Sequence, residues 1–384
     1  MNAEFIQALE QIEKEKNISK EVLLEAIENS LLTACKNHFG TSQNIQVTID
    51  NEQGNVVVLA EKEVVDNVEH KELQISLSDA REIDPNLELE DHVQIEVTPK
   101  DFGRIAAQKA KQVVVQKIRE AERDLLLNSY QEKEKEVVTG IIQRSAKDSV
   151  IVNLGKIDAI LADKEQVPGE AYLMNERIKV YVIEVKSGTK GPKIYVSRTH
   201  PDLVKRLFEN EVPEVHDGTV EIKSISREAG SRTKIAVYST KEEVDPVGSC
   251  VGHNGSRVSI IVNELNGEKI DIIPWNENVA EFIAASLSPS KVVQVAVNKP
   301  EKSAKVIVPD YQLSLAIGKE GQNARLAAKL TGYRIDIKSE TQAKEIGFIS
   351  KEELDNPDVL FLSANTGQNV EVDVNPFDES LFEE

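Results

Sequence analysis

One short pattern occurs twice in this chain, and it constrains the fold more than any other feature. Residues 245–273 and residues 309–337 each contain an apolar half-turn, a Gly-X-X-Gly sequence, a helix-like run and a short strand that ends in Ile-Asp-Ile. The glycine pairs are Gly252 with Gly255 and Gly318 with Gly321. A repeat of this length predicts a duplicated small domain rather than a short-period solenoid.

The residues before each glycine pair have the spacing of one helix face. They are Val247, Cys250 and Val251 in the first copy, and Leu313, Ala316 and Ile317 in the second. Two short helices must therefore meet at the Gly-X-X-Gly turn, where glycine permits positive φ and a close approach of another backbone. The second helix begins there, so its free N–H groups and positive dipole end point out of the turn.

A sugar-phosphate backbone is the natural occupant of such a turn, and the arrangement is that of the KH domain, whose GXXG loop clamps about four nucleotides. The order of the strand-like runs agrees with this. Two runs precede each copy and one ends it: 219–227, 232–239 and 269–273 for the first, and 291–298, 303–308 and 333–338 for the second. Two strands before the loop and one after it is the order of the type II, or bacterial-type, KH fold.

The residues expected to contact RNA are those of the two loops and of the helix starts, with two further arginines. They are Gly252, His253, Asn254, Gly255, Ser256, Arg257, Gly318, Lys319, Glu320, Gly321, Gln322, Asn323, Arg325, Arg232 and Arg198. Lysine and arginine suit phosphate, whereas the charge of Glu320 weakens the second loop. Basic residues at a hairpin turn, such as Arg232, are also commonly just solvated. His253 lacks the partner pattern of a catalyst.

Residues 131–199 change to strand periodicity. Five short runs rich in valine and isoleucine, separated by glycines and prolines, fit a five-stranded OB-type barrel. Their order and length resemble an S1 domain. Such barrels bind bases through exposed aromatic side chains, but this segment has few: Tyr172, Tyr181 and Tyr195, which are also compatible with half-buried strand or loop positions. The barrel is then expected to contribute cations, namely Lys147, Lys156 and Arg198.

Residues 1–130 predict a small α+β head. Helical periodicity covers residues 1–39, with Ser19 as an N-cap inside it, and strand-like runs follow at 44–50, 56–65 and 92–98. A long helix is expected from about residue 101 to residue 130. Its apolar content is thin at its start, which favours a solvated spacer.

Residues 200–217 predict a short helix and a proline-broken linker, with Leu203, Leu207 and Phe208 docking it onto a neighbour. Trp275 lies between the two KH copies, and interdomain packing is favoured there over base stacking. Residues 346–384 are acidic with scattered apolar positions, which predicts a flexible tail. The alternative is a segment that docks on a basic surface.

The net charge of −20 is unevenly distributed. Residues 1–130 hold 14 basic and 25 acidic residues, a net charge of −11, whereas residues 131–345 hold 31 of each. Residues 346–384 have one lysine and ten acids, a net charge of −9. RNA affinity must therefore come from placed contacts more than from a broad basic field, and we expect it to be modest.

Several classes of protein are disfavoured by composition. No run approaches the roughly 18–20 apolar residues that a membrane span needs, and the first residues are polar and acidic, unlike a signal peptide. Cys35 and Cys250 are far apart and have no metal-ligand spacing, so both are expected to be buried thiols in a reducing cytosol. We expect a cytoplasmic monomer without cofactor or metal.

The chain resembles the NusA family of bacterial transcription factors. The similar segments include ENEVPEV at 209–215, REAGSRTKIAV at 227–237, GEKIDIIPW at 267–275 and LAIGKEGQNARLA at 315–327. The resemblance implies an α+β multidomain chain: a head at 1–130, an S1 barrel at 131–199, KH domains at 200–278 and 279–345, and an acidic tail at 346–384. It also implies docking of the head on RNA polymerase at the β-flap and RNA exit channel, binding of single-stranded nascent RNA, and contacts with other Nus-type factors.

The implied outcomes are pausing, intrinsic termination and antitermination. Some family members carry two further acidic helical repeats after the second KH domain. This chain has only the acidic tail there, so contacts of those repeats are not carried over.

Two other function classes compete with this interpretation. An enzyme with KH and S1 modules, such as an exoribonuclease, needs phosphorolytic core domains, and a KH-bearing GTPase needs a P-loop, whose GxxxxGK[ST] pattern does not occur. A ribosome-associated or RNA-processing protein would favour a basic chain. The acidic head instead suits a basic protein partner, which favours the polymerase.

Overall fold

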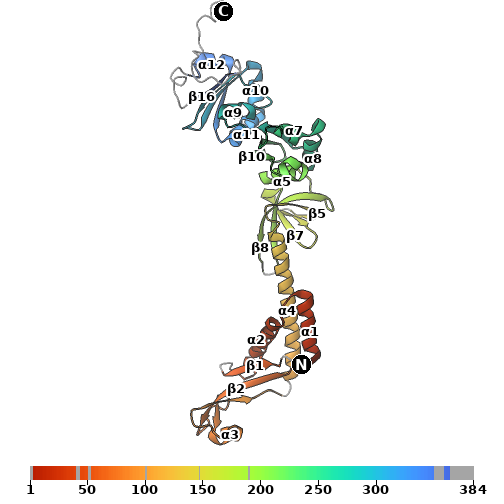
Figure 1. Ribbon diagram of the computed structural model, residues 1–384, viewed down its shortest axis with the longest axis vertical. Coiled ribbons are helices and arrows are strands. Elements are labelled where there is room, and N and C mark those ends of the chain that lie inside the picture. Colours follow the sequence, from red (N-terminus) through yellow and green to blue (C-terminus); the bar gives the residue numbers. More distant parts are fainter. Residues whose placement is uncertain are drawn as a thin grey trace, which may run out of the picture. The chain divides into compact units, whose positions relative to one another are not determined.

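The computed structural model describes residues 3–39, 44–50, 53–99, 102–146, 148–188, 191–349 and 359–363. The chain divides into two compact units, residues 1–129 and residues 130–384, whose elements Figure 1 labels. The first unit has one main hydrophobic cluster and a small one, and the second unit has several. Because Lys147 and most of the acidic tail fall outside the described residues, the predictions for them are not addressed by the structure.

The first unit packs two N-terminal helices and a long helix beside a small sheet. Its elements are α1 Ala3–Lys16, α2 Lys20–Phe39, β1 Ile45–Ile49, β2 Val56–Val65, β3 Gln74–Ser76, α3 Leu77–Ile83, β4 His92–Glu96 and α4 Phe102–Gln131. Strand β2 is central: it pairs antiparallel with β1 and β4 and parallel with β3. The predicted N-cap is present, since Ser19 Oγ accepts from the Val22 amide over 3.4 Å.

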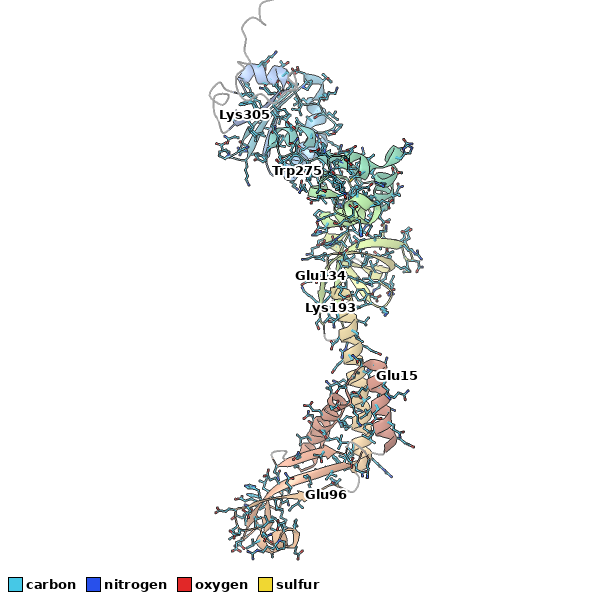
Figure 2. The ribbon with its side chains drawn as sticks, in the orientation of Figure 1. Glu15, Glu96, Glu134, Lys193, Trp275 and Lys305 are labelled. Atoms are coloured by element: carbon cyan, nitrogen blue, oxygen red, sulfur yellow. The ribbon has the colours of Figure 1, made fainter. Side chains whose placement is uncertain are left out.

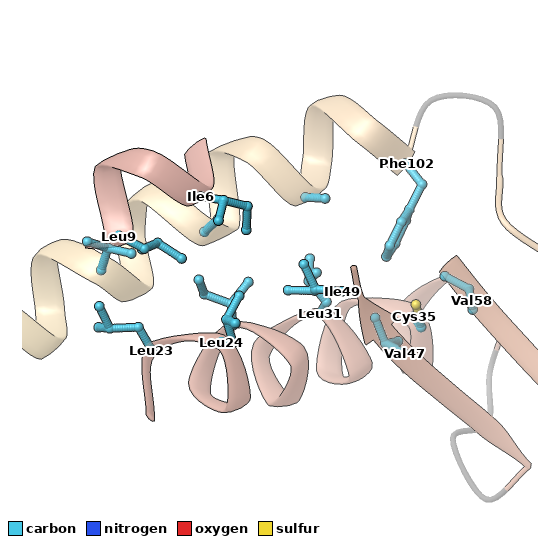
Figure 3. Close-up of a cluster of buried hydrophobic side chains, with 14 of the residues drawn as sticks. Ile6, Leu9, Leu23, Leu24, Leu31, Cys35, Val47, Ile49, Val58 and Phe102 are labelled. Carbon is cyan, nitrogen blue, oxygen red and sulfur yellow. The ribbon is translucent and has the colours of Figure 1, made fainter. Parts of the chain in front are cut away.

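The start of α4 is not the solvated spacer that its thin apolar content predicted. Phe102, labelled in Figure 3, is buried in the core of the unit. Ala106, Ala110 and Val114 are buried in the same cluster. They follow one helix face, and the small alanines allow α4 to approach its neighbours closely. The prediction was wrong because an alanine stripe contributes little hydrophobicity but much complementarity of shape.

Strand β3 and helix α3 were not predicted. They pack over a small core of Val64, Ala80 and Val93, separate from the main core of the unit. A strand of three residues and a helix of seven contain too few periodic positions to be recognised in a sequence.

The second unit begins with a closed five-stranded barrel, as predicted. Its strands are β5 Val137–Ala146, β6 Ser149–Asn153, β7 Asp158–Ala162, β8 Arg177–Lys186 and β9 Lys193–Ser197. They close in the order β5-β6-β7-β9-β8, with β7 and β9 parallel. The inward-facing residues are the expected valines and isoleucines, among them Val152, Val180 and Ile194, which are fully buried.

Two domains of one topology follow the barrel. The first has α5 Pro201–Glu211, α6 Pro213–His216, β10 Val220–Glu228, β11 Arg232–Ser239, α7 Pro246–Val251, α8 Ser256–Glu264 and β12 Lys269–Pro274. The second has α9 Val279–Ser286, β13 Gln294–Asn298, β14 Ser303–Val308, α10 Leu313–Ile317, α11 Gln322–Thr331, β15 Arg334–Ser339 and α12 Glu340–Ile346. In each domain an antiparallel hairpin is followed by two helices and a parallel third strand, which is the predicted order.

Helix α5 joins the barrel to the first of these domains. Leu203, Leu207 and Phe208 are buried in one cluster with Tyr181 of the barrel and Ile235 of β11. This confirms the docking predicted for these three side chains. Their spacing puts them on one face of α5, so a single helix covers both neighbours.

Trp275 lies at the junction of the two repeated domains (Figure 2). It packs against a cluster that contains Ile273 of the first domain and Phe282 and Leu330 of the second. Its ring also meets that of Tyr238 edge to face, with centroids 5.4 Å apart. The interdomain packing predicted for this tryptophan is thereby confirmed.

One segment of the region predicted to be a flexible acidic tail forms a strand among the described residues. Strand β16, Val359–Ser363, pairs antiparallel with β13 and becomes the fourth strand of the second domain's sheet. It covers the edge of β13, whose N–H and C=O groups would otherwise be unpaired. Leu360 and Leu362 of this strand pack against the hydrophobic core of the second repeated domain.

Candidate nucleic-acid interface

The first Gly-X-X-Gly loop turns the chain sharply between α7 and α8. Gly252 has φ 75° and ψ 174°, Asn254 has φ 50° and ψ 30°, and Gly255 has φ 75° and ψ 14°. All three lie at positive φ, which glycine adopts freely and asparagine tolerates.

The second loop repeats this backbone almost angle for angle. Gly318 has φ 77° and ψ 171°, Glu320 has φ 53° and ψ 26°, and Gly321 has φ 75° and ψ 15°. A glutamate at positive φ is unusual, because only glycine and, less often, asparagine or aspartate adopt it readily. The same shape is therefore built twice, and in the second loop at some cost in backbone strain.

The two glycines of each loop serve different purposes. A Cβ on Gly252 would stand 2.7 Å from Arg257 Cγ, and one on Gly318 would stand 2.8 Å from the Asn323 nitrogen, so the first glycine is required by packing. A Cβ on Gly255 or Gly321 would meet nothing closer than 3.9 Å. The second glycine thus leaves open space at the outside of the loop, where a ligand backbone can approach.

The helices that follow the loops begin without side-chain caps. At α8 and α11 no side chain accepts a hydrogen bond from the first amides. Other helices of this unit do have such caps: His200 on α5, Asp245 on α7, Asn278 on α9 and Ser339 on α12. The first amide of each helix donates inside its loop, from Ser256 N–H to the His253 carbonyl and from Gln322 N–H to the Lys319 carbonyl. With no capping side chain in the way, the positive end of each helix dipole still attracts an anion.

Exposed polar side chains line the two loops. His253, Asn254 and Ser256 are exposed at the first, and Lys319 and Glu320 at the second. His253 Nε2 and Asn254 Nδ2 lie 3.2 Å apart. Lys319 has no ion-pair partner among the residues that the structure describes, so its ammonium group is available to a phosphate.

The two arginines beside the loops have internal partners. Arg257 Nη1 donates to Glu214 over 3.0 Å and to the Ser249 carbonyl over 2.7 Å. Arg325 Nε donates to Glu228 over 2.7 Å, and Nη1 donates to the Glu320 carbonyl over 3.0 Å. Each guanidinium is partly exposed and close to its loop, but neither is free of a carboxylate.

Gln322 and Asn323 have different surroundings. Gln322 Nε2 donates to Glu228 and to Ser231 Oγ, over 2.8 Å in both cases. Asn323 is buried, and its amide group donates to the carbonyls of Leu287 and Ala316 over 3.0 Å. The RNA contact predicted for Asn323 is therefore wrong, because this buried side chain instead links α11 to the end of α9 and to α10.

Arg198 was predicted to contact RNA, but its side chain is buried in the structure. Its side chain is 2% exposed and pairs with Glu170, and its Nη atoms donate to the carbonyls of Lys179 and Glu264 over 3.0 Å. The contacts join the barrel to α8 of the next domain. This corrects the prediction: a buried arginine with all these partners cannot reach an RNA strand.

Arg232 is likewise occupied. Its guanidinium donates to both oxygens of Asp271, over 2.7 and 2.9 Å. Lys234, fully buried, donates to the same carboxylate over 2.9 Å and to the Ser288 carbonyl over 2.8 Å. Burial alone would raise the pKa of Asp271, but the two cations outweigh it and lower the pKa. The group holds the two repeated domains together.

The barrel presents no described tyrosine as a free stacking surface. Tyr181 is buried against His200, with ring centroids 4.6 Å apart, and Tyr172 and Tyr195 are half-buried. Burial and the hydrogen bond to Glu170 raise the pKa of the Tyr172 hydroxyl above its usual range. Lys156 is exposed in the loop between β6 and β7.

Exposed apolar side chains lie beside the second loop; Tyr311 and Leu315 were not singled out in the sequence, and Ile317 was placed on the same helix face as the buried Ala316. Leu315 and Ile317 on α10 are 47% and 36% exposed, and Tyr311 just before them is 82% exposed. The helical periodicity that predicts a core position for Ala316 places Leu315 on the solvent side of the same helix. Tyr311 is the kind of exposed aromatic side chain on which a base can stack.

Among the described residues, no cluster of three or more His, Cys, Asp or Glu could hold a metal ion. Their helices also include none with the length and hydrophobicity to cross a membrane.

Comparison with known families gives the same division of the chain. Residues 4–124 match the NusA N-terminal domain, and residues 131–197 match the S1 RNA binding domain. Residues 198–275 and 279–345 match the NusA-like first and second KH domains.

Full-length relatives are similar over almost the whole chain. A transcription termination/antitermination protein NusA of Halalkalibacterium halodurans is 56% identical over 374 residues, covering 97% of this chain and 98% of the relative. The chain belongs to the NusA family. The protein of that name from Bacillus subtilis is 55% identical, covering 97% of this chain and all of the relative. That from Thermus thermophilus is 39% identical, covering 87% and 89%.

Membership of the NusA family confirms the resemblance stated from the sequence segments and the fold class predicted from them. The S1 barrel and both KH domains of the NusA family are present in the order expected.

Proposed function

We propose that this chain is a non-enzymatic transcription elongation factor that holds nascent RNA while docked on RNA polymerase. The observation that carries the proposal is the pair of Gly-X-X-Gly loops, which share one backbone geometry and lead into uncapped helix starts. Two such loops in two domains that pack against each other are suited to the sugar-phosphate backbone of a single strand. The names of the relatives support termination and antitermination as the processes affected.

RNA contact is assigned to the loops by chemistry. The open side of Gly255 and Gly321 admits the backbone, and the positive dipole ends of α8 and α11 attract phosphate oxygens there. Lys319 supplies a charge-assisted contact. The residues Gly252, His253, Asn254, Ser256, Gly318, Glu320 and Gln322 complete the two loops. Arg257 and Arg325 reach phosphate only in competition with their internal carboxylates.

Polymerase contact is assigned to the head. Its net charge of −11 suits a basic protein surface, and the family resemblance supports the β-flap beside the RNA exit channel as that surface. Docking there raises the local concentration of RNA at the loops to about the millimolar range, so weak intrinsic affinity is enough. Pausing, intrinsic termination and antitermination would then follow from retaining or guiding the transcript. The site of action is cytoplasmic, the factor is a monomer, and other Nus-type factors can join it.

Crosslinking within a stalled elongation complex tests the whole proposal. We expect crosslinks from residues 1–130 to polymerase and from the two loops to the emerging transcript. A chain without residues 1–130 should lose polymerase pull-down while keeping its binding to free RNA. Retained pull-down would move the anchor to another domain, and loop positions that never crosslink to RNA would refute the RNA assignment.

A further inference from the structure

Glu228, the last residue of β10 in the first KH domain, bonds to the helix that begins at the second domain's loop. Its Oε1 accepts from Arg325 Nε over 2.7 Å, and its Oε2 accepts from Gln322 Nε2 over 2.8 Å. The two donors lie in the first turn of α11. One carboxylate of the first KH domain is thus held at the start of the RNA-facing helix of the second.

Arg325 is placed where an RNA phosphate would need it. Its Nη1 donates to the Glu320 carbonyl inside the loop, and a Cβ on Gly321 would stand 3.9 Å from that same Nη1. Its side chain is 48% exposed, so solvent and ligands can reach it. The hydrogen bond and charge of Arg325 lower the pKa of Glu228, so the carboxylate is ionised at neutral pH.

We propose that Glu228 is an internal competitor of RNA: its carboxylate occupies Arg325 in the free protein and gives it up when a phosphate enters the second loop. This inference rests on the proposed function of that loop. Carboxylate and phosphate offer a guanidinium the same kind of charge-assisted bond, and the charge of Glu228 also repels an approaching phosphate. RNA therefore exchanges one ionic contact for another rather than adding one. RNA binding by the second loop becomes weaker and more readily reversible. A transcript that must move through the loop as the polymerase elongates it requires such reversible binding.

The first loop contains a similar pair built from other positions. Arg257 donates to Glu214, which lies on α6 just before the hairpin of the same domain. In the repeat, however, Arg257 corresponds to Asn323, and Arg325 corresponds to Ser259. The two ion pairs are therefore not copies inherited from one duplicated domain. In each domain an arginine beside the loop is paired with a carboxylate, but the residues that form the pair stand at different positions of the repeat.

The test measures binding of a fluorescent single-stranded RNA of about ten nucleotides, enough for two loops that each hold about four. We expect Glu228→Gln and Glu228→Ala to bind about two- to fivefold more tightly than the wild type, the fold-change that loss of a partly exposed ion pair gives. The slope of log affinity against log salt should steepen by about 0.7, the value for one additional phosphate contact on a single strand. Glu243→Gln removes an exposed carboxylate of the same domain and should leave both quantities unchanged.

A double-mutant cycle decides between competition and support. In an Arg325→Gln background, Glu228→Gln should tighten binding clearly less than it does in the wild type, because no guanidinium is left to be released and only the repulsion by the carboxylate is removed. If both Glu228 variants instead weaken binding while thermal unfolding is unaltered, Glu228 supports RNA contact and the proposal is overturned. Unchanged affinity and salt slope overturn it as well, and leave the proposed function intact. A wild-type protein that fails to bind the RNA at all would instead remove the proposed function itself.

Discussion

A carboxylate placed at the second glycine of each loop should specifically repel RNA. Gly255 and Gly321 both have φ 75°, and a Cβ at either would meet nothing closer than 3.9 Å. Aspartate therefore fits sterically and directs its charge into the space assigned to the phosphate. Asparagine has the same shape and the same tolerance of positive φ, so Gly255→Asn with Gly321→Asn is the matched control. We expect both double variants to lose a similar stability, about 1–2 kcal/mol per site.

The charge sets the difference between the two double variants. Two unit charges 4 Å apart interact by about 1 kcal/mol in water and about 4 kcal/mol near a protein surface. The loops are exposed, so we expect about 1–2 kcal/mol for each. Together they should weaken RNA binding roughly 30- to 700-fold at low salt. At position 321 the new carboxylate also reaches Arg325 and withdraws it from RNA.

Fluorescence anisotropy with a labelled single strand measures the effect at low and at near-physiological salt, and thermal unfolding monitors the fold. The deficit of the aspartate variant relative to the asparagine variant should shrink as salt rises, because exposed charges are screened. Equal affinity of the two variants at low salt would refute the placement of phosphate at these glycines.

Three further predictions follow from the site and its supports. Lys319→Gln should weaken RNA binding and reduce the salt slope by about 0.7, with unfolding unchanged; an unaltered slope would exclude Lys319 from phosphate contact. Arg198→Met should destabilise the second unit by about 3–5 kcal/mol in thermal unfolding, because Glu170 is left as a buried charge. A loss of RNA affinity without a loss of stability would instead show that Arg198 contacts RNA. Burial acts to raise the pKa of Glu268, but the hydrogen bond and charge of Arg227 outweigh it and lower the pKa. The ion pair of Glu268 with Arg227 therefore stabilises the fold above the unfolded-state pKa of about 4.3, and this stabilisation is lost as pH falls through the pKa of Glu268 in the folded state. The difference in free energy of unfolding between the wild type and Glu268→Gln should narrow over that acid range. A difference that stays constant would refute the assignment.

The local features of this protein were readable from its sequence. Glycine spacing fixed the two loops, since few other residues adopt the dihedral angles of Gly252 and Gly318. Alternating valines and isoleucines predicted the barrel strands, and the order of strands predicted the KH topology. These properties depend on neighbours a few residues away, so a linear pattern contains them.

The partners of the charged residues were decided only by the tertiary structure. Arg198 and Arg325 looked alike as phosphate ligands, yet one is enclosed by Glu170 from the barrel and the other is held at the surface by Glu228 of the neighbouring domain. Their partners lie 28 and 97 residues away along the chain. The strand at 359–363 and the buried alanine stripe of α4 were hidden for the same reason. The energy of a charge or of a small side chain depends on what folding brings against it, and no periodicity records that.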